Sequence, residues 1–163
     1  MFKGTYRHRL DAKGRLPIPA PFRRSLAAEG SKGLVATLVD QCIAVYPAAE
    51  WQRLEDQLRR LPTFHRQTKA LSRNLASRAV DCGLDGQGRI LLPHALRAAA
   101  SLQQEAVVVG VIDRIEVWSP GAWEDFLRAS ERLLEDVSLE VAWPVPGRDS
   151  GTGGGGPGST GKP

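Results

Sequence analysis

The phrase Asp11-Ala-Lys-Gly-Arg15 recurs in this chain as Asp85-Gly-Gln-Gly-Arg89, and in both places a short apolar run and a proline follow it. The match continues at the same offset of 74, where the corresponding pairs are Leu16 and Ile90, Ile18 and Leu92, Pro19 and Pro93, Phe22 and Leu96, and Arg23 and Arg97. A unit of roughly 45 residues is therefore duplicated. Because solenoid arrays need about three or more units, two copies favour pairing about a pseudo-two-fold axis.

The similarity extends into the second half of each unit. Residues 34–46 resemble residues 107–118, at an offset that slips by one, to 73. The exits are alike as well, because Tyr46-Pro47 precedes Trp51 just as Trp118-Ser119-Pro120 precedes Trp123. We therefore expect the same order of elements in both copies, two strands, a helix and two strands, with a further helix after each copy.

Length and composition indicate a globular protein. The chain has 163 residues, 42% of them apolar, which suits one compact domain or two small ones. Each unit alone is too small to bury a large core, so we expect the two to pack together. No apolar stretch reaches the roughly 18 to 20 residues of a membrane span, and the start lacks the apolar core of a signal peptide. The sequence thus predicts a cytoplasmic protein with no membrane partner, whose Cys42 and Cys82 stay reduced.

Charge is distributed unevenly between the two halves. Residues 1–80 contain 15 Lys or Arg against 6 Asp or Glu, whereas residues 81–163 contain 7 against 12. A basic half favours a polyanionic partner, because neutralised phosphates release their condensed counterions. Solvated surface charge is the alternative explanation for about half of these side chains.

Each unit is expected to begin with a strand that leads into a turn. Thr5, Arg7 and Arg9 alternate with Tyr6, His8 and Leu10, which is the period of a half-buried strand with one apolar and one cationic face. In the phrase that comes next, Asp11 and Asp85 are expected to accept backbone hydrogen bonds. Gly14 and Gly88 are expected to adopt the positive φ that other residues resist.

The remaining elements are predicted from periodicity and from prolines. We expect a short helix over 19–28, strands over 35–39 and 43–46, and helices over about 48–61 and 63–79. The apolar stripe of the 48–61 helix is interpreted as core. Arg66, Lys69 and Arg73 form a basic stripe on the next helix, which is either a solvated face or a nucleic-acid contact. An acidic helix is expected to end near Asp136, and the Gly- and Pro-rich tail beyond it is predicted to be disordered.

The doubled motif resembles a known signature. Leu10–Pro19 and Leu84–Pro93 spell Leu-Asp-x-x-Gly-Arg-hydrophobic-x-hydrophobic-Pro, which is similar to AbrB-type swapped-hairpin DNA-binding domains. Two such units after Met-Phe-Lys-Gly resemble the MraZ family of bacterial transcriptional regulators, over about residues 1 to 137.

This resemblance implies an α+β fold in which the hairpins of both units interlock into a pseudo-dimeric β-barrel with flanking helices, and in which subunits close into a homo-oligomeric ring. It also implies binding of double-stranded DNA at promoter repeats upstream of the division and cell-wall gene cluster, usually with repression of the protein's own operon, and hence a nucleoid-associated location. The corresponding boundaries are 5–50 and 78–122 for the two AbrB-like domains, 51–77 for a helical connector, 123–140 for a C-terminal helix and 144–163 for the tail.

Carried over by motif, Arg15 and Arg89 are the arginines of the two phrases. An arginine fork can grip guanine or phosphate in bidentate fashion, so contact with DNA is favoured for Arg15, with a structural pair to Asp11 as the alternative. For Arg89 the structural role is favoured, because Asp81 and Asp85 lie nearby and Gln87 replaces Lys13. We predict a DNA-binding surface dominated by the first repeat, with the residues Arg7, Arg9, Lys13, Arg15 and Arg89.

Other functional classes find less support in the sequence. His8, His65 and His94 are isolated, no metal-ligand spacing occurs, and no serine or cysteine lies in a nucleophile elbow. We therefore expect no enzyme, no catalytic residue, no metal, no cofactor and no small-molecule substrate. The alternatives that remain are a structural or protein-interaction ring without DNA activity and an antitoxin-like module, although the latter usually has a single unit.

Overall fold

The computed structural model describes residues 1–30, 33–62 and 64–135. The predicted tail at 144–163 and the end of the predicted C-terminal helix at 136–140 lie outside the described residues. Met1–Arg128 forms one compact unit, which contains every helix and strand except the last turns of the final helix.

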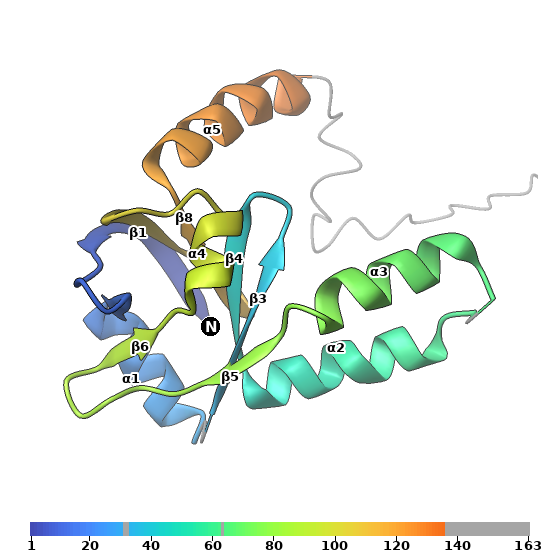
Figure 1. The fold of residues 1–163 in the computed structure, drawn as a ribbon, viewed down its shortest axis with the longest axis horizontal. Coiled ribbons are helices and arrows are strands. Elements are labelled where there is room, and N and C mark those ends of the chain that lie inside the picture. Colours follow the sequence, from blue (N-terminus) through green and yellow to red (C-terminus); the bar gives the residue numbers. More distant parts are fainter. Residues whose placement is uncertain (31–32, 63, 136–163) are drawn as a thin grey trace, which may run out of the picture. The chain divides into compact units, whose positions relative to one another are not determined.

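The fold is of mixed α+β type (Figure 1). Its elements in chain order are β1 (Phe2–Arg9), β2 (Arg15–Pro17), α1 (Ala20–Ala28), β3 (Leu34–Val39), β4 (Cys42–Pro47), α2 (Ala48–Arg60), α3 (Arg66–Ala76), β5 (Val80–Cys82), β6 (Arg89–Leu91), α4 (His94–Ala99), β7 (Glu105–Ile112), β8 (Arg114–Trp118) and α5 (Pro120–Glu135). The order strand, strand, helix, strand, strand, helix thus occurs twice, with α3 inserted between the copies.

Strand pairing crosses from one repeat to the other. A six-stranded antiparallel sheet has the order β1-β7-β8-β4-β3-β5, and a separate two-stranded sheet pairs β2 with β6. The first strand of each repeat therefore lies beside the third strand of the other. When the repeats are exchanged, the strand order reads the same in reverse, which is the pseudo-two-fold relation that the duplicated sequence predicts.

The prediction of a closed barrel is wrong. The strands form two sheets, and within the described part of the chain no ladder joins the edge strands β1 and β5. The physical reason is that β2, β5 and β6 each have only three residues, which is too short for the strands to close a barrel. Proline lacks the N–H that a ladder requires, so Pro19 and Pro93, which precede α1 and α4, prevent β2 and β6 from continuing into longer strands.

The offset between the second halves of the repeats is also corrected by the structure. Asp40 and Ile112 open equivalent two-residue turns, with φ values of 51° and 59°, and the flanking pairs are Val39 with Cys42 and Val111 with Arg114. Positions 40 and 112 differ by 72, not 73. Helix α4 has six residues where α1 has nine, so the second copy is shortened at its helix.

The main core lies between the two sheets. Leu16 of β2 and Ile90 of β6 are fully buried and belong to the same apolar cluster as Val108, Ile115 and Val117 of the large sheet. Aromatic contacts extend this core to α1, because the ring of Phe22 meets those of Phe2 and Tyr6 edge-on at 5.7 and 5.2 Å. A smaller cluster on the opposite face of the large sheet contains Cys42, Val107, Val109 and Trp118, with Trp123 against it.

Helices α2 and α3 run side by side as a hairpin (Figure 1). The Thr37 hydroxyl is fully buried and donates a 2.8 Å hydrogen bond to the Leu75 carbonyl, which fastens α3 to β3. The interpretation of the α2 stripe as core is wrong for this chain, because Trp51, Leu54 and Leu58 are half-buried and Leu61 is 40% exposed. No helix in the described residues is long and apolar enough to cross a membrane.

Candidate nucleic-acid interface

The first phrase folds into a tight turn around the carboxylate of Asp11. Its Oδ1 accepts hydrogen bonds from the backbone N–H groups of Lys13 at 2.9 Å and Arg15 at 3.0 Å. The Gly14 N–H donates to the Asp11 carbonyl, and the Asp11 N–H donates to the Arg15 carbonyl. Gly14 has a φ of 84°, in the left-handed region that favours glycine.

The second phrase forms the same turn. Asp85 Oδ1 accepts from the N–H groups of Gln87 and Arg89 at 2.9 and 3.0 Å, and Gly88 has a φ of 72°. The backbone bonds between Asp85 and Gly88 and between Asp85 and Arg89 repeat those of the first turn. Since Lys13 and Gln87 occupy equivalent positions, the turns differ in charge but not in shape.

Each aspartate also braces the arginine of its own phrase. Arg15 Nε donates to Asp11 Oδ2 at 2.6 Å, while Arg89 places Nε and Nη2 at 2.9 and 2.8 Å from Asp85 Oδ2. Backbone hydrogen bonds, first from Arg15, hold the pKa of Asp11 below its usual value, and bonds from the backbone and side chain of Arg89 lower the pKa of Asp85 to about 2. The ion pairs with Asp11 and Asp85 hold the two guanidinium groups in defined positions.

The β2–β6 ladder places both arginines on one outward face. Arg15 is paired with Leu91 and Arg89 with Pro17, and the intervening Leu16 and Ile90 point into the core. Backbone bonds of 3.0 Å run from Ile18 N–H to the Gly88 carbonyl and from Leu92 N–H to the Gly14 carbonyl, so each turn is fastened to the other repeat. The two phrases therefore build one continuous surface.

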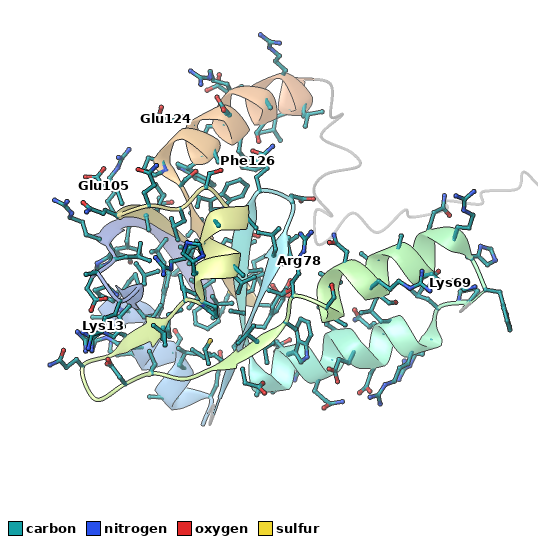
Figure 2. All side chains as sticks on the ribbon, in the orientation of Figure 1. Lys13, Lys69, Arg78, Glu105, Glu124 and Phe126 are labelled. Atoms are coloured by element: carbon teal, nitrogen blue, oxygen red, sulfur yellow. The ribbon has the colours of Figure 1, made fainter. Side chains whose placement is uncertain are left out.

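The other predicted site residues are placed differently. Lys13 is exposed on the first turn, beside this ladder (Figure 2). Arg7 and Arg9 are exposed on β1, but their register partners Val107 and Glu105 put them on the face of the large sheet that lies away from the β2–β6 ladder. Arg9 Nη2 donates to Gln104 at 3.0 Å, and both arginines line a pocket with Pro120. The structure thus unites Lys13, Arg15 and Arg89 and leaves Arg7 and Arg9 on a separate face.

Two further arginines lie at the turns. Each one contacts the turn of the opposite repeat and not the turn that is nearer to it in the sequence. Arg23 stands close to Arg15 in sequence, yet it lies against Gly88 of the second turn. Arg97 of the second repeat lies against Gly14 of the first. The equivalence of Arg23 and Arg97 at the offset of 74 is the signal that marks them as a pair. Only the crossed strand pairing shows which turn each one reaches.

The described part of the chain contains no group of three or more His, Cys, Asp or Glu side chains that could hold a metal ion. Cys42 is buried and Cys82 is half-buried, and this burial raises the pKa of the Cys42 thiol far above its usual value and that of the Cys82 thiol to about 11.

These observations define a class, a tandem-repeat α+β protein whose two repeats jointly present arginines braced by aspartates. The family model described as "MraZ protein, putative antitoxin-like" matches residues 1–74 and again residues 75–138. The chain belongs to the MraZ family.

Curated relatives cover most of the chain. It is 47% identical to the transcriptional regulator MraZ of Moorella thermoacetica and 42% identical to that of Natranaerobius thermophilus, in each case over 86% of this chain and 96% of the relative. The corresponding protein of Desulfitobacterium hafniense strain Y51 is 46% identical over 80% of this chain and 90% of the relative. The names of these relatives support a role in transcription regulation.

Proposed function

We propose that this protein is a sequence-specific DNA-binding transcriptional regulator, which binds repeated elements upstream of the division and cell-wall gene cluster and represses its own operon. The observation that carries the proposal is the outward face of the β2–β6 ladder, where Arg15 of one repeat and Arg89 of the other lie diagonally across the ladder on the same face. Braced guanidinium groups suit DNA, because their fixed forks match phosphate oxygens or the guanine edge and lose little entropy on binding. Lys13 adds a phosphate contact that strengthens binding without reading sequence.

We further infer that the chains assemble into a ring and that the crossed repeats represent the swapped-hairpin arrangement of AbrB-like domains, with boundaries at 5–50 and 78–122. Apolar side chains that a single chain leaves exposed support assembly, among them Phe64 at 89%, Leu71 at 45% and Leu127 at 43%. A ring can place several such surfaces on several DNA repeats, so each weak contact gains from a high effective concentration. Such a protein would be found at the nucleoid.

The test is a titration of the full chain into a labelled duplex of its own upstream region, read by fluorescence anisotropy at several salt concentrations. We expect binding that weakens steeply with salt and that Arg15→Ala removes. Arg53→Ala is the matched control, because Arg53 is an exposed arginine of α2 paired with Glu50. Native mass spectrometry should show the same assembly for all three proteins.

Two results would contradict the proposal in different ways. Undiminished binding by a folded Arg15→Ala protein would remove this residue from the site. Failure of the wild-type chain to bind any upstream fragment at low salt would instead favour an interaction ring without DNA activity.

A further inference from the structure

The glycine of each turn faces an arginine from the opposite repeat. A Cβ placed on Gly88 would lie 2.5 Å from Cδ and from Nη1 of Arg23, on α1. A Cβ placed on Gly14 would lie 2.7 Å from Nε, 2.8 Å from Cζ and 2.9 Å from Nη2 of Arg97, on α4. Both side chains therefore occupy space that only glycine leaves open, directly before Arg89 and Arg15 in the chain.

This exchange is a consequence of the topology. Pro19 and Pro93 begin the helices that carry Arg23 and Arg97, directly after the residues that hydrogen-bond across to Gly88 and Gly14. Each helix therefore starts against the turn of the other repeat. The contact between a helix arginine and a turn glycine occurs on both sides of the pseudo-two-fold axis. It is therefore a feature of the fold and not an accident of one exposed side chain.

Among the described residues, no carboxylate forms an ion pair with either of these two arginines. Arg15 and Arg89 are paired with Asp11 and Asp85, whereas neither Arg23 nor Arg97 makes an ion pair in the described part of the chain. Arg97 is half-buried and donates from Nε to the Leu92 carbonyl at 3.0 Å, which orients its guanidinium and leaves its Nη groups for a ligand. Arg23 is exposed.

We propose that Arg23 and Arg97 are phosphate-contacting residues of the DNA surface, each supplied by the helix of one repeat to the turn of the other. The inference rests on the proposed function and extends it, because it makes the surface a product of both repeats. Lys13 and four arginines, Arg15, Arg23, Arg89 and Arg97, then surround the two carboxylates of Asp11 and Asp85. Although the second half of the sequence has more acidic than basic residues, the surroundings of Arg89 therefore include basic side chains from the first repeat.

The experiment measures anisotropy of the native upstream duplex over a range of salt concentrations with full-length Arg23→Ala and Arg97→Ala. We expect each variant to lose affinity on the order of tenfold. We also expect the slope of log K against log salt to fall by about 1, as the loss of one phosphate contact requires. Arg24→Ala is the matched control, since Arg24 is the next residue on the same helix, is equally charged and is exposed. It should leave both quantities unchanged.

Thermal unfolding separates binding from folding, because Arg97→Ala also removes the bond to Leu92. Arg97→Lys restores the charge without the guanidinium fork and should recover most of the salt slope. The Arg23 side chain donates no hydrogen bond to the backbone of the described residues, so Arg23→Ala should keep the wild-type melting temperature. The inference is overturned if Arg23→Ala and Arg97→Ala bind with wild-type affinity and slope, or no more weakly than Arg24→Ala, while Arg15→Ala abolishes binding. If the wild-type chain binds no upstream duplex, the proposed function fails with it.

Discussion

Arg89 Nη1 lies 3.7 Å from Oδ2 of Asp11, across the boundary between the two repeats. The second-repeat arginine is therefore shared between its own Asp85, at 2.8 Å, and the aspartate of the first turn, which also holds Arg15. This arrangement links the two turns through side chains in addition to the backbone bonds from Ile18 and Leu92. Arg89 is also more enclosed than Arg15, with 22% of its side chain exposed against 35%.

Double-mutant cycles should rank these two contacts. We expect the coupling between Asp85→Ala and Arg89→Ala to exceed that between Asp11→Ala and Arg89→Ala. In the first pair two guanidinium nitrogens lie within 3 Å of one Asp85 oxygen, whereas the second contact is long and partly screened. Urea unfolding of the single and double variants provides the coupling energies. A larger coupling for Asp11 would show that the inter-repeat contact is the tighter one in solution.

The ion pair of Asp85 should make stability depend on pH in the acidic range. Its folded pKa of about 2 is below its ordinary value of 3.8, so its contribution is fully present above the ordinary value and is lost as the pH falls toward about 2. Asp85→Asn keeps an oxygen for the backbone N–H groups but removes the charge. Its melting temperature should lie below that of the wild type at neutral pH and approach it near pH 2. A constant difference at all pH values would exclude the carboxylate charge as the cause.

Alanine at the turn glycines should destabilise the fold. Gly14→Ala forces a side chain into the left-handed region at a cost of roughly 1–2 kcal/mol and displaces Arg97 in addition. Gly88→Ala should cost less, because the exposed Arg23 can swing away whereas Arg97 is tied to Leu92. Gly86→Ala is the control, since a Cβ there meets nothing within 4 Å and its φ is not positive. Chemical denaturation gives the three values, and equal losses at all three glycines would disprove this account.

Thr37→Val should weaken the attachment of α3. The variant keeps the shape of the buried side chain but leaves the Leu75 carbonyl without its 2.8 Å donor, which costs about 1–3 kcal/mol. Thr5→Val, at an exposed position of β1, should change the free energy of unfolding little. Hydrogen exchange should show faster opening of α3 in Thr37→Val than in the wild type. Unchanged exchange would mean that apolar packing of Leu75 alone holds the helix.

Local patterns in the sequence predicted the elements well. The alternation over residues 5–10, the prolines before α1 and α4 and the helical stripe over 48–61 all correspond to elements of the structure. Such features depend on neighbours within a few residues, so a single sequence contains them. The duplicated phrase also predicted two equivalent turns, and the backbone bonds of Asp11 and Asp85 are the same.

Relations between distant residues could not be predicted in this way. Nothing near Arg23 in the sequence indicates that it reaches Gly88, because that contact depends on how the repeats cross. Arg7 and Arg9 share the basic first half with Arg15, yet the pleat of β1 turns them to the other face of the sheet. The barrel prediction failed for a different reason, because three-residue strands such as β5 have too few backbone groups to join the edges of the sheet.

The crossed pairing of β1 with β7 also sets the order in which this chain can fold during synthesis. Phe2 pairs with Ile112, so the first strand leaves the ribosome long before its partner has been translated. Until then the alternating side chains of β1 and the apolar residues of β3 and β4 have only part of their sheet. Such non-local pairing slows folding, because the entropy cost of closing a long loop comes before the contacts that stabilise the closed loop can form. Nascent chains arrested before residue 105 should therefore be protease-sensitive, and the native sheet should form only after β7 and β8 have emerged.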